Sequence, residues 1–282
     1  MAKLLEGKPI AEKIKEEIKN EIKALGKRPV LVSVQVGENA GAEAYAKSQK
    51  KTADNLGIDY QFHKLGEDTT EKTLCEFIQK LNADKSVNGI IVQMPLPAQI
   101  DYKKISNFIS PEKDVEGMHP ANMGKIVFGK AKILPCTPAA VMELLTSCCP
   151  DVYGKEVVIV GHSEIVGKPL ALLLLEKFAT VTVCHIGTSK AGKLEEHVRR
   201  AEILIVAVGK AGLIKGEWIK EGAVVIDVGI NRVGDKIVGD VEFESASQRA
   251  CCITPVPGGV GPLTVTMLMR NVVEAAKAQA NV

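Results

Sequence analysis

The sequence lacks a charge excess of either sign. Across its 282 residues, 36 lysines and arginines nearly balance 34 aspartates and glutamates, which leaves a formal net charge of +2. Attraction to nucleic acid or to an acidic membrane surface requires a strong basic field. We therefore expect neither nucleic acid nor membrane as a partner, and a ligand that is recognised by local contacts.

Long apolar runs are also missing. The N-terminal segment MAKLLEGKPIAEKIKEE is charged and helix-patterned, without the apolar centre that a signal peptide needs. No window approaches the roughly 20 apolar residues of a membrane span. These two absences predict a cytoplasmic protein.

Paired cysteines and clustered metal ligands are absent too. The seven cysteines include no Cys-x-x-Cys spacing, and the adjacent pairs Cys148-Cys149 and Cys251-Cys252 cannot readily bridge within themselves. The five histidines are dispersed, and no carboxylate cluster accompanies them at ligand spacing. We expect reduced, structural thiols and no metal.

Apolar runs alternate with amphipathic helical stretches along the whole chain. The first series comprises VLVSVQVG, AEAYAKSQKKTADNLG, YQFHKL, LCEFIQKL and NGIIVQMPLP, which is a βαβαβ pattern. The fully apolar strand at 89–92 indicates burial on both faces, as in a parallel sheet covered by helices. Residues 1–140 are interpreted as one α/β unit, onto which the terminal helix from about residue 268 to 282 returns.

A second series occupies residues 141–267. It runs KEVVIVG, KPLALLLLEKF, ATVTVCH, KLEEHVRRA, EILIVAVG, AVVIDVG and KIVGDV. The order and spacing are typical of a dinucleotide-binding series. The fold class predicted from both series is α/β with two domains.

The turn from 161 to 167, GHSEIVG, joins a strand directly to an apolar helix. Gly161 allows a sharp turn, Gly167 allows close backbone approach, and free N–H groups at the helix start favour a pyrophosphate. Ser163 and Val166 replace the second and third glycines of the generic G-x-G-x-x-G pattern, so the spacing alone is a weak signal. An ordinary strand-to-helix turn with a serine cap is the alternative.

Cofactor preference is usually set where the second strand ends, by an acid for NAD or an arginine for NADP. Here that strand ends in Cys184-His185-Ile186-Gly187, which offers neither. His162 and Ser163 could contact a 2′-phosphate, although histidine is a weaker and pH-dependent anion partner.

Tyr45 and Gln49 are four residues apart on a predicted helix and share a face. Taken alone, a tyrosine on a helix is more often a core or edge residue, and a glutamine among lysines is usually solvated. VQMPLP and PEKDVEGMHP are likewise compatible with a buried strand and a polar loop.

Together, seven segments resemble the methylenetetrahydrofolate dehydrogenase/cyclohydrolase family. They appear in the family's order over essentially the whole chain: VGENAGAEAYAKSQKK, VQMPLP, PEKDVEGMHPANMGK, PCTP, GHSEIVGKP, DVGIN and TPVPGGVGPLT. The resemblance implies a homodimer of two α/β domains around a cleft, with a folate-binding catalytic domain and a Rossmann-type NAD(P)-binding domain. It also implies oxidation of 5,10-methylene- to 5,10-methenyltetrahydrofolate, followed by hydrolysis to 10-formyltetrahydrofolate.

The resemblance also implies site residues. Tyr45 would stack on the substrate, and the folate pocket would be lined by Val92, Gln93, Met94 and the segment Pro257, Gly258, Gly259, Val260 and Gly261. The catalytic group would be Tyr45, Gln49, Gln93 and Glu116. The dinucleotide would be held by Gly161, His162, Ser163, Val166, Gly167, Ile186 and Ile230.

The chain departs from the family pattern at two positions that the resemblance assigns to catalysis. Gln49 stands where the family has a lysine, and glutamine cannot titrate, while Glu116 stands where an aspartate is usual and is expected to keep its charge. These changes lead to the hypothesis of a dehydrogenase with weak or absent cyclohydrolase activity. A fully bifunctional enzyme and a non-catalytic folate or dinucleotide sensor are the alternatives.

The cofactor-binding positions depart as well. His162 and Ile186 replace an arginine and a serine that are common in the family. Losing even one charge-assisted hydrogen bond to the 2′-phosphate, worth about 1.5–3 kcal/mol, could lower the preference for NADP over NAD roughly tenfold. NADP is the family default, and NAD becomes a serious competitor.

Overall fold

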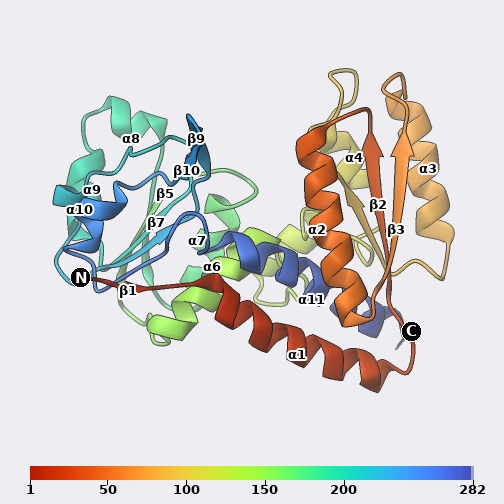
Figure 1. Ribbon diagram of the computed structural model, residues 1–282, viewed down its shortest axis with the longest axis horizontal. Helices are drawn as coiled ribbons and strands as arrows, with labels where there is room; N and C mark the ends of the chain where they lie inside the picture. The colour runs from red at the N-terminus through yellow and green to blue at the C-terminus, as the bar shows by residue number, and fades with distance from the viewer. Residues whose placement is uncertain (281–282) are drawn as a thin grey trace. The chain divides into compact units, whose positions relative to one another are not determined.

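The computed structural model describes residues 1–280 and divides into two compact units. One unit, here called the three-stranded unit, contains Lys13–Cys136 and the residues from Val265 onward. The other, the six-stranded unit, contains Met1–Glu12 and Thr137–Thr264. Figure 1 shows both units, with labels on many of their elements.

The three-stranded unit is built on a parallel sheet in the order β3-β2-β4. The βαβαβ series predicted from sequence is present as β2 (Val30–Val36), α2 (Ala40–Leu56), β3 (Asp59–Leu65), α3 (Glu71–Ala83) and β4 (Gly89–Val92). All four residues of β4 are buried, as its uninterrupted apolar sequence predicts. The unit continues with α4 (Tyr102–Phe108) and α5 (Pro120–Val127).

Strand β2 separates an apolar from a polar environment. Val32 and Val34 join the apolar cluster that contains Leu74 of α3. Because successive side chains of a strand point to opposite faces, Ser33 and Gln35 lie on the other face, and both are buried. Ser33 accepts a hydrogen bond from Gln93 Nε2, and Gln35 Nε2 donates to the carbonyl of Gly37. The Oε1 of Gln35 has no hydrogen-bond partner among the described residues.

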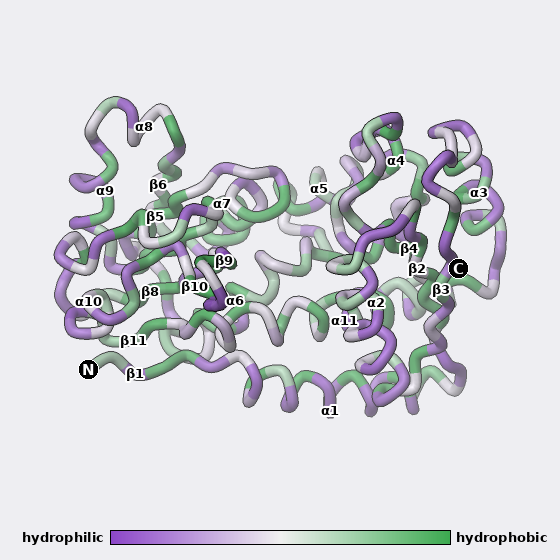
Figure 2. The backbone as a smooth tube through the Cα atoms, turned by 45° about the horizontal axis from the view of Figure 1, so that its top comes forward, coloured by the Kyte–Doolittle hydropathy of each residue, from purple (hydrophilic) through white to green (hydrophobic). Residues whose placement is uncertain are grey.

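Two long helices contain the division between the units, α1 (Gly7–Leu25) and α11 (Gly261–Ala280). In α1 the buried residues Ile14, Ile18 and Ile22 recur at helical spacing. Figure 2 shows the matching alternation of hydrophilic and hydrophobic residues along α1.

The six-stranded unit has a parallel sheet in the order β1-β11-β8-β7-β5-β6. Its elements are β1 (Lys3–Leu4), α6 (Cys136–Cys148), β5 (Glu156–Val160), α7 (Gly167–Glu176), β6 (Thr180–Cys184), α8 (Ile186–Lys190), α9 (Leu194–Arg200), β7 (Ile203–Val206), the 3₁₀ turn η1 (Gly216–Trp218), β8 (Val224–Asp227), α10 (Phe243–Ser247) and β11 (Cys252–Ile253). The chain leaves β5 toward β6 and returns on its other side as β7, so β5 and β7 flank a topological switch point. Ligands of open α/β sheets bind at such points.

Two details differ from the sequence interpretation. Residues 1–12, assigned there to the first domain, group with the six-stranded unit because β1 pairs in parallel with β11. The segment KIVGDV does not extend the large sheet: β10 (Lys236–Val238) forms an antiparallel hairpin with β9 (Asn231–Val233).

The core of the six-stranded unit is formed by its strands and the helices beside them, including Val158, Leu204, Val225 and Val198. All seven cysteines are free thiols. Within residues 1–280, no helix is both long and apolar enough to cross a membrane.

Candidate functional site

A cavity of about 360 Å³ lies at the switch point of the six-stranded sheet. It is lined by the carboxyl ends of β5, β6 and β7 and the turns that follow them. The lining residues are Val160, Gly161, His162, Ser163, His185, Ile186, Ser189, Leu194, Ala207, Val208, Lys210 and Leu213. Four residues predicted to bind the cofactor are therefore brought together here: Gly161, His162, Ser163 and Ile186.

The turn between β5 and α7 has the backbone geometry that a pyrophosphate site needs. Gly161 has φ +124°, and a Cβ added there would collide with the carbonyl oxygen of Ala207. A Cβ on Gly167 would collide with the carbonyl oxygen of Gly161. Both positions therefore require glycine, and the turn brings the start of α7, with its helix dipole, beside the cavity.

Ser163 takes part in this turn without capping the helix. Its Oγ accepts a hydrogen bond from the N–H of Val166 at 3.1 Å, while α7 begins at Gly167. Ser163 therefore forms a bond inside the turn, and α7 has no side-chain cap.

Two histidines lie close together in the lining of this cavity. The rings of His162 and His185 are tilted, with centroids 5.1 Å apart. His185 Nδ1 accepts a hydrogen bond from the N–H of Gly187 at 3.1 Å, which fixes the ring at the start of α8. Ile186 follows with 67% of its surface exposed, and Ile230 lies outside this lining with 69% exposed.

Lys210 is a cationic residue of the cavity lining that lies outside the sequence motifs of the predicted site. It lies just after β7, in a loop that Asp240 organises: the Asp240 carboxylate accepts from the N–H groups of Val208, Gly209 and Lys210 at 2.7–3.0 Å. Its position could have indicated it from the sequence, because Lys210 follows β7, the strand next to β5 at the switch point, where ligands of such sheets bind.

A second cavity, of about 440 Å³, lies in the three-stranded unit at the carboxyl end of β4 and the first turns of α2. It is lined by Asn39, Gly41, Ala42, Tyr45, Ile91, Val92, Gln93, Met94, Pro95 and Glu116. Five of the predicted folate-site residues meet here: Tyr45, Val92, Gln93, Met94 and Glu116. Tyr45 is 40% exposed.

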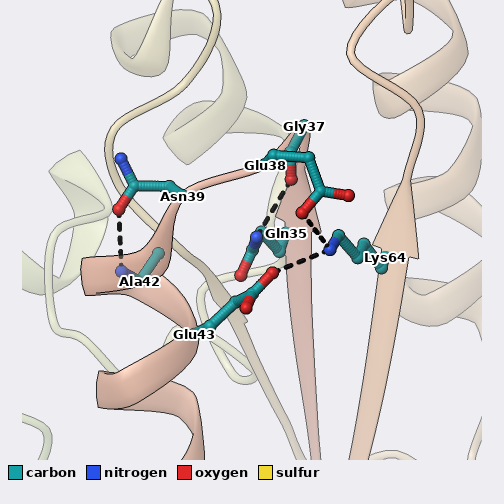
Figure 3. Close-up of polar contacts among 7 residues, drawn as sticks. All are labelled: Gln35, Gly37, Glu38, Asn39, Ala42, Glu43 and Lys64. Atoms are coloured by element: carbon teal, nitrogen blue, oxygen red, sulfur yellow. Dashed lines mark hydrogen bonds and ion pairs between the residues drawn. The ribbon is translucent and has the colours of Figure 1, made fainter.

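The start of α2, which carries Tyr45, is held by a polar clasp (Figure 3). Lys64 on β3 pairs with Glu38 at 2.6 Å and with Glu43 at 2.7 Å. The hydrogen bond and charge of Lys64 hold the pKa of Glu43 below its usual value. Asn39 caps the helix by accepting from the N–H of Ala42 at 2.9 Å.

Gln49 is fully buried, so the alternative of a solvated surface glutamine is wrong. Its Oε1 accepts from the Tyr60 hydroxyl and from Gln93 Nε2, each at 2.8 Å. Gln49 thus reaches the cavity through Gln93, and both partners come from other elements of the unit.

Glu116 behaves differently from the sequence expectation that it keeps its charge. Burial, with a smaller contribution from the charge of Asp114, raises its pKa to about 8, against the opposing effect of a hydrogen bond with Tyr102. At neutral pH the carboxyl group is therefore mostly protonated. A group that gains and loses a proton near pH 8 is suited to acid–base work.

Three buried polar residues fix the segment that carries Glu116. Asp114 accepts from the N–H of His119 at 2.7 Å, and Asn271 Nδ2 donates to the carbonyl of Val115 at 2.8 Å. Lys113 Nζ donates to the carbonyls of residues 81, 82 and 84 at 2.6–2.8 Å, at the end of α3. These contacts lock the backbone on both sides of the carboxyl group.

The predicted segment Pro257–Gly261 belongs to the six-stranded unit, so its role in the folate pocket stays a prediction. Its start is anchored there by Gly7, whose N–H donates to the carbonyl of Gly258 at 2.9 Å. Within residues 1–280, no three His, Cys, Asp or Glu residues are arranged to hold a metal ion.

The fold and the two cavities define an α/β protein with a Rossmann-type dinucleotide-binding unit. Models of tetrahydrofolate dehydrogenase/cyclohydrolase match residues 5–116 as the catalytic domain and 135–280 as the NAD(P)-binding domain. The chain therefore belongs to the tetrahydrofolate dehydrogenase/cyclohydrolase family.

Individual relatives agree over nearly their whole length. The chain is 52% identical to the bifunctional protein FolD of Acetivibrio thermocellus, over 99% of this chain and 98% of that protein. It superposes on the bifunctional FolD of Campylobacter jejuni with a TM-score of 0.95 at 44% identity, covering 99% of both chains. The Trypanosoma brucei enzyme, solved with NADP and an inhibitor, gives a TM-score of 0.94 at 37% identity, covering 100% of this chain and 99% of that one.

Proposed function

We propose that this chain oxidises 5,10-methylenetetrahydrofolate to 5,10-methenyltetrahydrofolate, with NAD(P)⁺ as the hydride acceptor. The observation that carries the proposal is the cavity that unites Tyr45, Gln93 and Glu116, in a chain that also carries the glycine turn at 161–167. Tyr45 offers an aromatic face for stacking on the folate. Gln93 orients the substrate through hydrogen bonds.

The chemistry of this step is mainly one of positioning and charge. A bound dinucleotide supplies the hydride acceptor. Loss of the hydride leaves a delocalised positive charge on the folate, which the ionised form of Glu116 stabilises from the wall of the cavity. The residues that hold the dinucleotide are Gly161, His162, Ser163 and Ile186, with Val166 and Gly167 at the start of the helix.

The test is the production of reduced dinucleotide from methylenetetrahydrofolate by the purified protein. Sustained turnover supports the enzyme and excludes the sensor alternative. A protein that binds folate and dinucleotide but yields no reduced dinucleotide would refute the proposal.

We further propose that the chain hydrolyses methenyltetrahydrofolate to 10-formyltetrahydrofolate. Relatives that are named bifunctional favour this second activity over the hypothesis of weak or absent hydrolysis. Since Gln49 cannot titrate, the proton-handling role passes to Glu116, whose pKa of about 8 lies near neutral pH.

Hydrolysis is tested by supplying methenyltetrahydrofolate without dinucleotide and comparing its decay with the spontaneous rate. We expect decay above the spontaneous rate in the wild type, and near it in Glu116→Gln. If methenyltetrahydrofolate decays only at the spontaneous rate in the presence of the wild type, the result would instead support a dehydrogenase without hydrolase activity. Gln49→Lys should then gain hydrolysis.

On the cofactor, we propose that NAD competes seriously with NADP. The family default and the NADP complex of the Trypanosoma brucei enzyme favour NADP, and Lys210 adds a cation to the cavity. His162 and Ile186 favour NAD, because neither supplies the permanent charge that a 2′-phosphate prefers.

A homodimer and a cytoplasmic location complete the proposal. Exposed apolar side chains on the β9–β10 hairpin, Val233 at 55% and Ile237 at 47%, support an association surface. Sedimentation equilibrium tests the dimer, and a monomer at micromolar concentration would refute it. The free thiols suit a reducing compartment.

A further inference from the structure

Four buried side chains beside the folate cavity form a ring that is joined by three hydrogen bonds and one further contact. They are Ser33 on β2, Gln49 on α2, Tyr60 on β3 and Gln93 just after β4, so the ring ties one helix to all three strands. Ser33 and Gln49 are fully buried, Gln93 is 3% exposed and Tyr60 is 7% exposed. Only Gln93 of the four lines the cavity, among the lining residues that the structure describes.

Each bond of the ring has a defined donor. Tyr60 donates its hydroxyl to Gln49 Oε1 at 2.8 Å. Gln93 Nε2 donates one hydrogen to Gln49 Oε1 at 2.8 Å and the other to Ser33 Oγ at 2.9 Å. Ser33 completes the ring from beside Tyr60, whose pKa it lowers against the larger effect of burial.

Counting donors and acceptors shows what is left for a ligand. A glutamine amide has two N–H donors, and both of those on Gln93 are used inside the ring. The Gln93 carbonyl oxygen is therefore its free hydrogen-bonding group. Gln93 can accept a hydrogen bond from a ligand in the cavity and has none to give.

We propose that Tyr60 is a positioning residue for folate, because its hydroxyl holds the Gln49 carbonyl toward Gln93 and so leaves the Gln93 carbonyl for an N–H group of the substrate. The inference rests on the proposed function, since it names folate as the ligand. Burial raises the pKa of Tyr60 to about 12, so the hydroxyl keeps its proton over the working pH range. Tyr60 itself does not line the cavity and acts through Gln49.

The ring satisfies the carbonyl oxygen of Gln49, while Gln49 Nε2 has no hydrogen-bond partner among the described residues. Its Oε1 accepts two hydrogen bonds, from Tyr60 and from Gln93, whereas a side chain with donors alone could not accept either. Ser33 anchors Gln93 from the opposite side. Removing the Tyr60 hydroxyl leaves the Gln49 side-chain amide with one hydrogen-bond partner instead of two. The side-chain amides of Gln49 and Gln93 can then rotate by 180°, which exchanges their oxygen and nitrogen positions.

The experiment measures binding of tetrahydrofolate and of dinucleotide to the full chain by calorimetry. In Tyr60→Phe, the Kd of tetrahydrofolate should rise about fivefold, the effect of one neutral hydrogen bond, with the Kd of dinucleotide unchanged. Tyr153→Phe, which removes a hydroxyl from a tyrosine that is 72% exposed in the other unit, is the matched control and should leave both values unchanged.

A double-mutant cycle separates positioning from general destabilisation. Gln49→Met removes the acceptor, so adding Tyr60→Phe to it should change the Kd of tetrahydrofolate by less than about twofold. Equal effects of Tyr60→Phe in the two backgrounds would overturn the inference. So would wild-type folate affinity in Tyr60→Phe, or a parallel loss of folate and dinucleotide binding.

The inference and the proposed function fail in different ways. A wild type that binds and oxidises folate while Tyr60→Phe binds it equally well refutes the inference alone. A wild type that binds folate without oxidising it refutes the dehydrogenase and leaves the binding comparison decisive. A wild type that binds no tetrahydrofolate refutes both.

Discussion

The substitution Glu116→Gln should remove a pH dependence from the oxidation step. Glutamine preserves the size and the hydrogen-bonding capacity of the side chain but cannot ionise. Glu116 lines the cavity in which, in the proposed reaction, positive charge develops on the folate. The rate of hydride transfer should therefore rise as Glu116 loses its proton.

The size of the rise follows from the pKa. Burial and the neighbouring charge of Asp114 raise the pKa of Glu116 to about 8. With that value, ~10% of the carboxyl groups are ionised at pH 7 and ~90% at pH 9. If only the ionised form is fully productive, kcat should increase about ninefold over this interval. Glu116→Gln should remain near the low-pH rate throughout.

The assay is kcat for methylenetetrahydrofolate oxidation from pH 6.5 to 9.5, with a deuterated methylene group to show that hydride transfer limits the rate. Glu112→Gln is the matched control, because it neutralises an exposed carboxylate in the same segment and should keep the wild-type profile. A wild-type profile that is flat between pH 7 and 9 would refute the reasoning. An unchanged ninefold rise in Glu116→Gln would refute it equally.

Three further substitutions test other parts of the account. Lys113→Met leaves three partly buried backbone carbonyls without their charged donor and should lower the free energy of unfolding by about 3 kcal/mol in urea titrations. A loss below about 1 kcal/mol would contradict the idea that Lys113 holds this segment in place. Gly167→Ala pushes a methyl group into the carbonyl of Gly161 and should weaken dinucleotide binding about tenfold or more, with folate binding kept. Unchanged dinucleotide affinity would contradict the proposal that the turn at 161–167 binds the pyrophosphate. His162→Arg should shift the ratio of kcat/KM toward NADP about tenfold, and no shift would mean that the 2′-phosphate binds elsewhere.

Much of the fold could be predicted because its main strands are long and apolar. Strands β2, β5 and β7 each place at least four buried residues in succession, and periodicity detects such runs. Strand β1 has two residues in a charged segment and is defined by backbone pairing with β11, which no side-chain pattern reveals. For the same reason, the three-residue strand β10 could not be distinguished from a further strand of the large sheet.

Part of the candidate site could be predicted from sequence motifs, and part depends on contacts that only the folded chain makes. Tyr45, Gln93 and Glu116 could be placed together because the family motifs contain them, and the structure brings them into one cavity. Two members of the hydrogen-bond network could not be predicted, because Tyr60, which donates to Gln49, and Ser33, which accepts from Gln93, lie on strands outside those motifs. The protonation of Glu116 was also hidden, since it depends on burial and on Asp114 and Tyr102, whose positions only the folded chain fixes.

The most direct test of the account is the initial rate of methylenetetrahydrofolate oxidation by the purified protein, measured in parallel with NAD and NADP. The account predicts reduced dinucleotide in both reactions, with kcat/KM values within about tenfold of each other, because His162 and Ile186 have replaced strong phosphate partners. Absence of reduced dinucleotide in both reactions would contradict the assignment of this chain as a dehydrogenase.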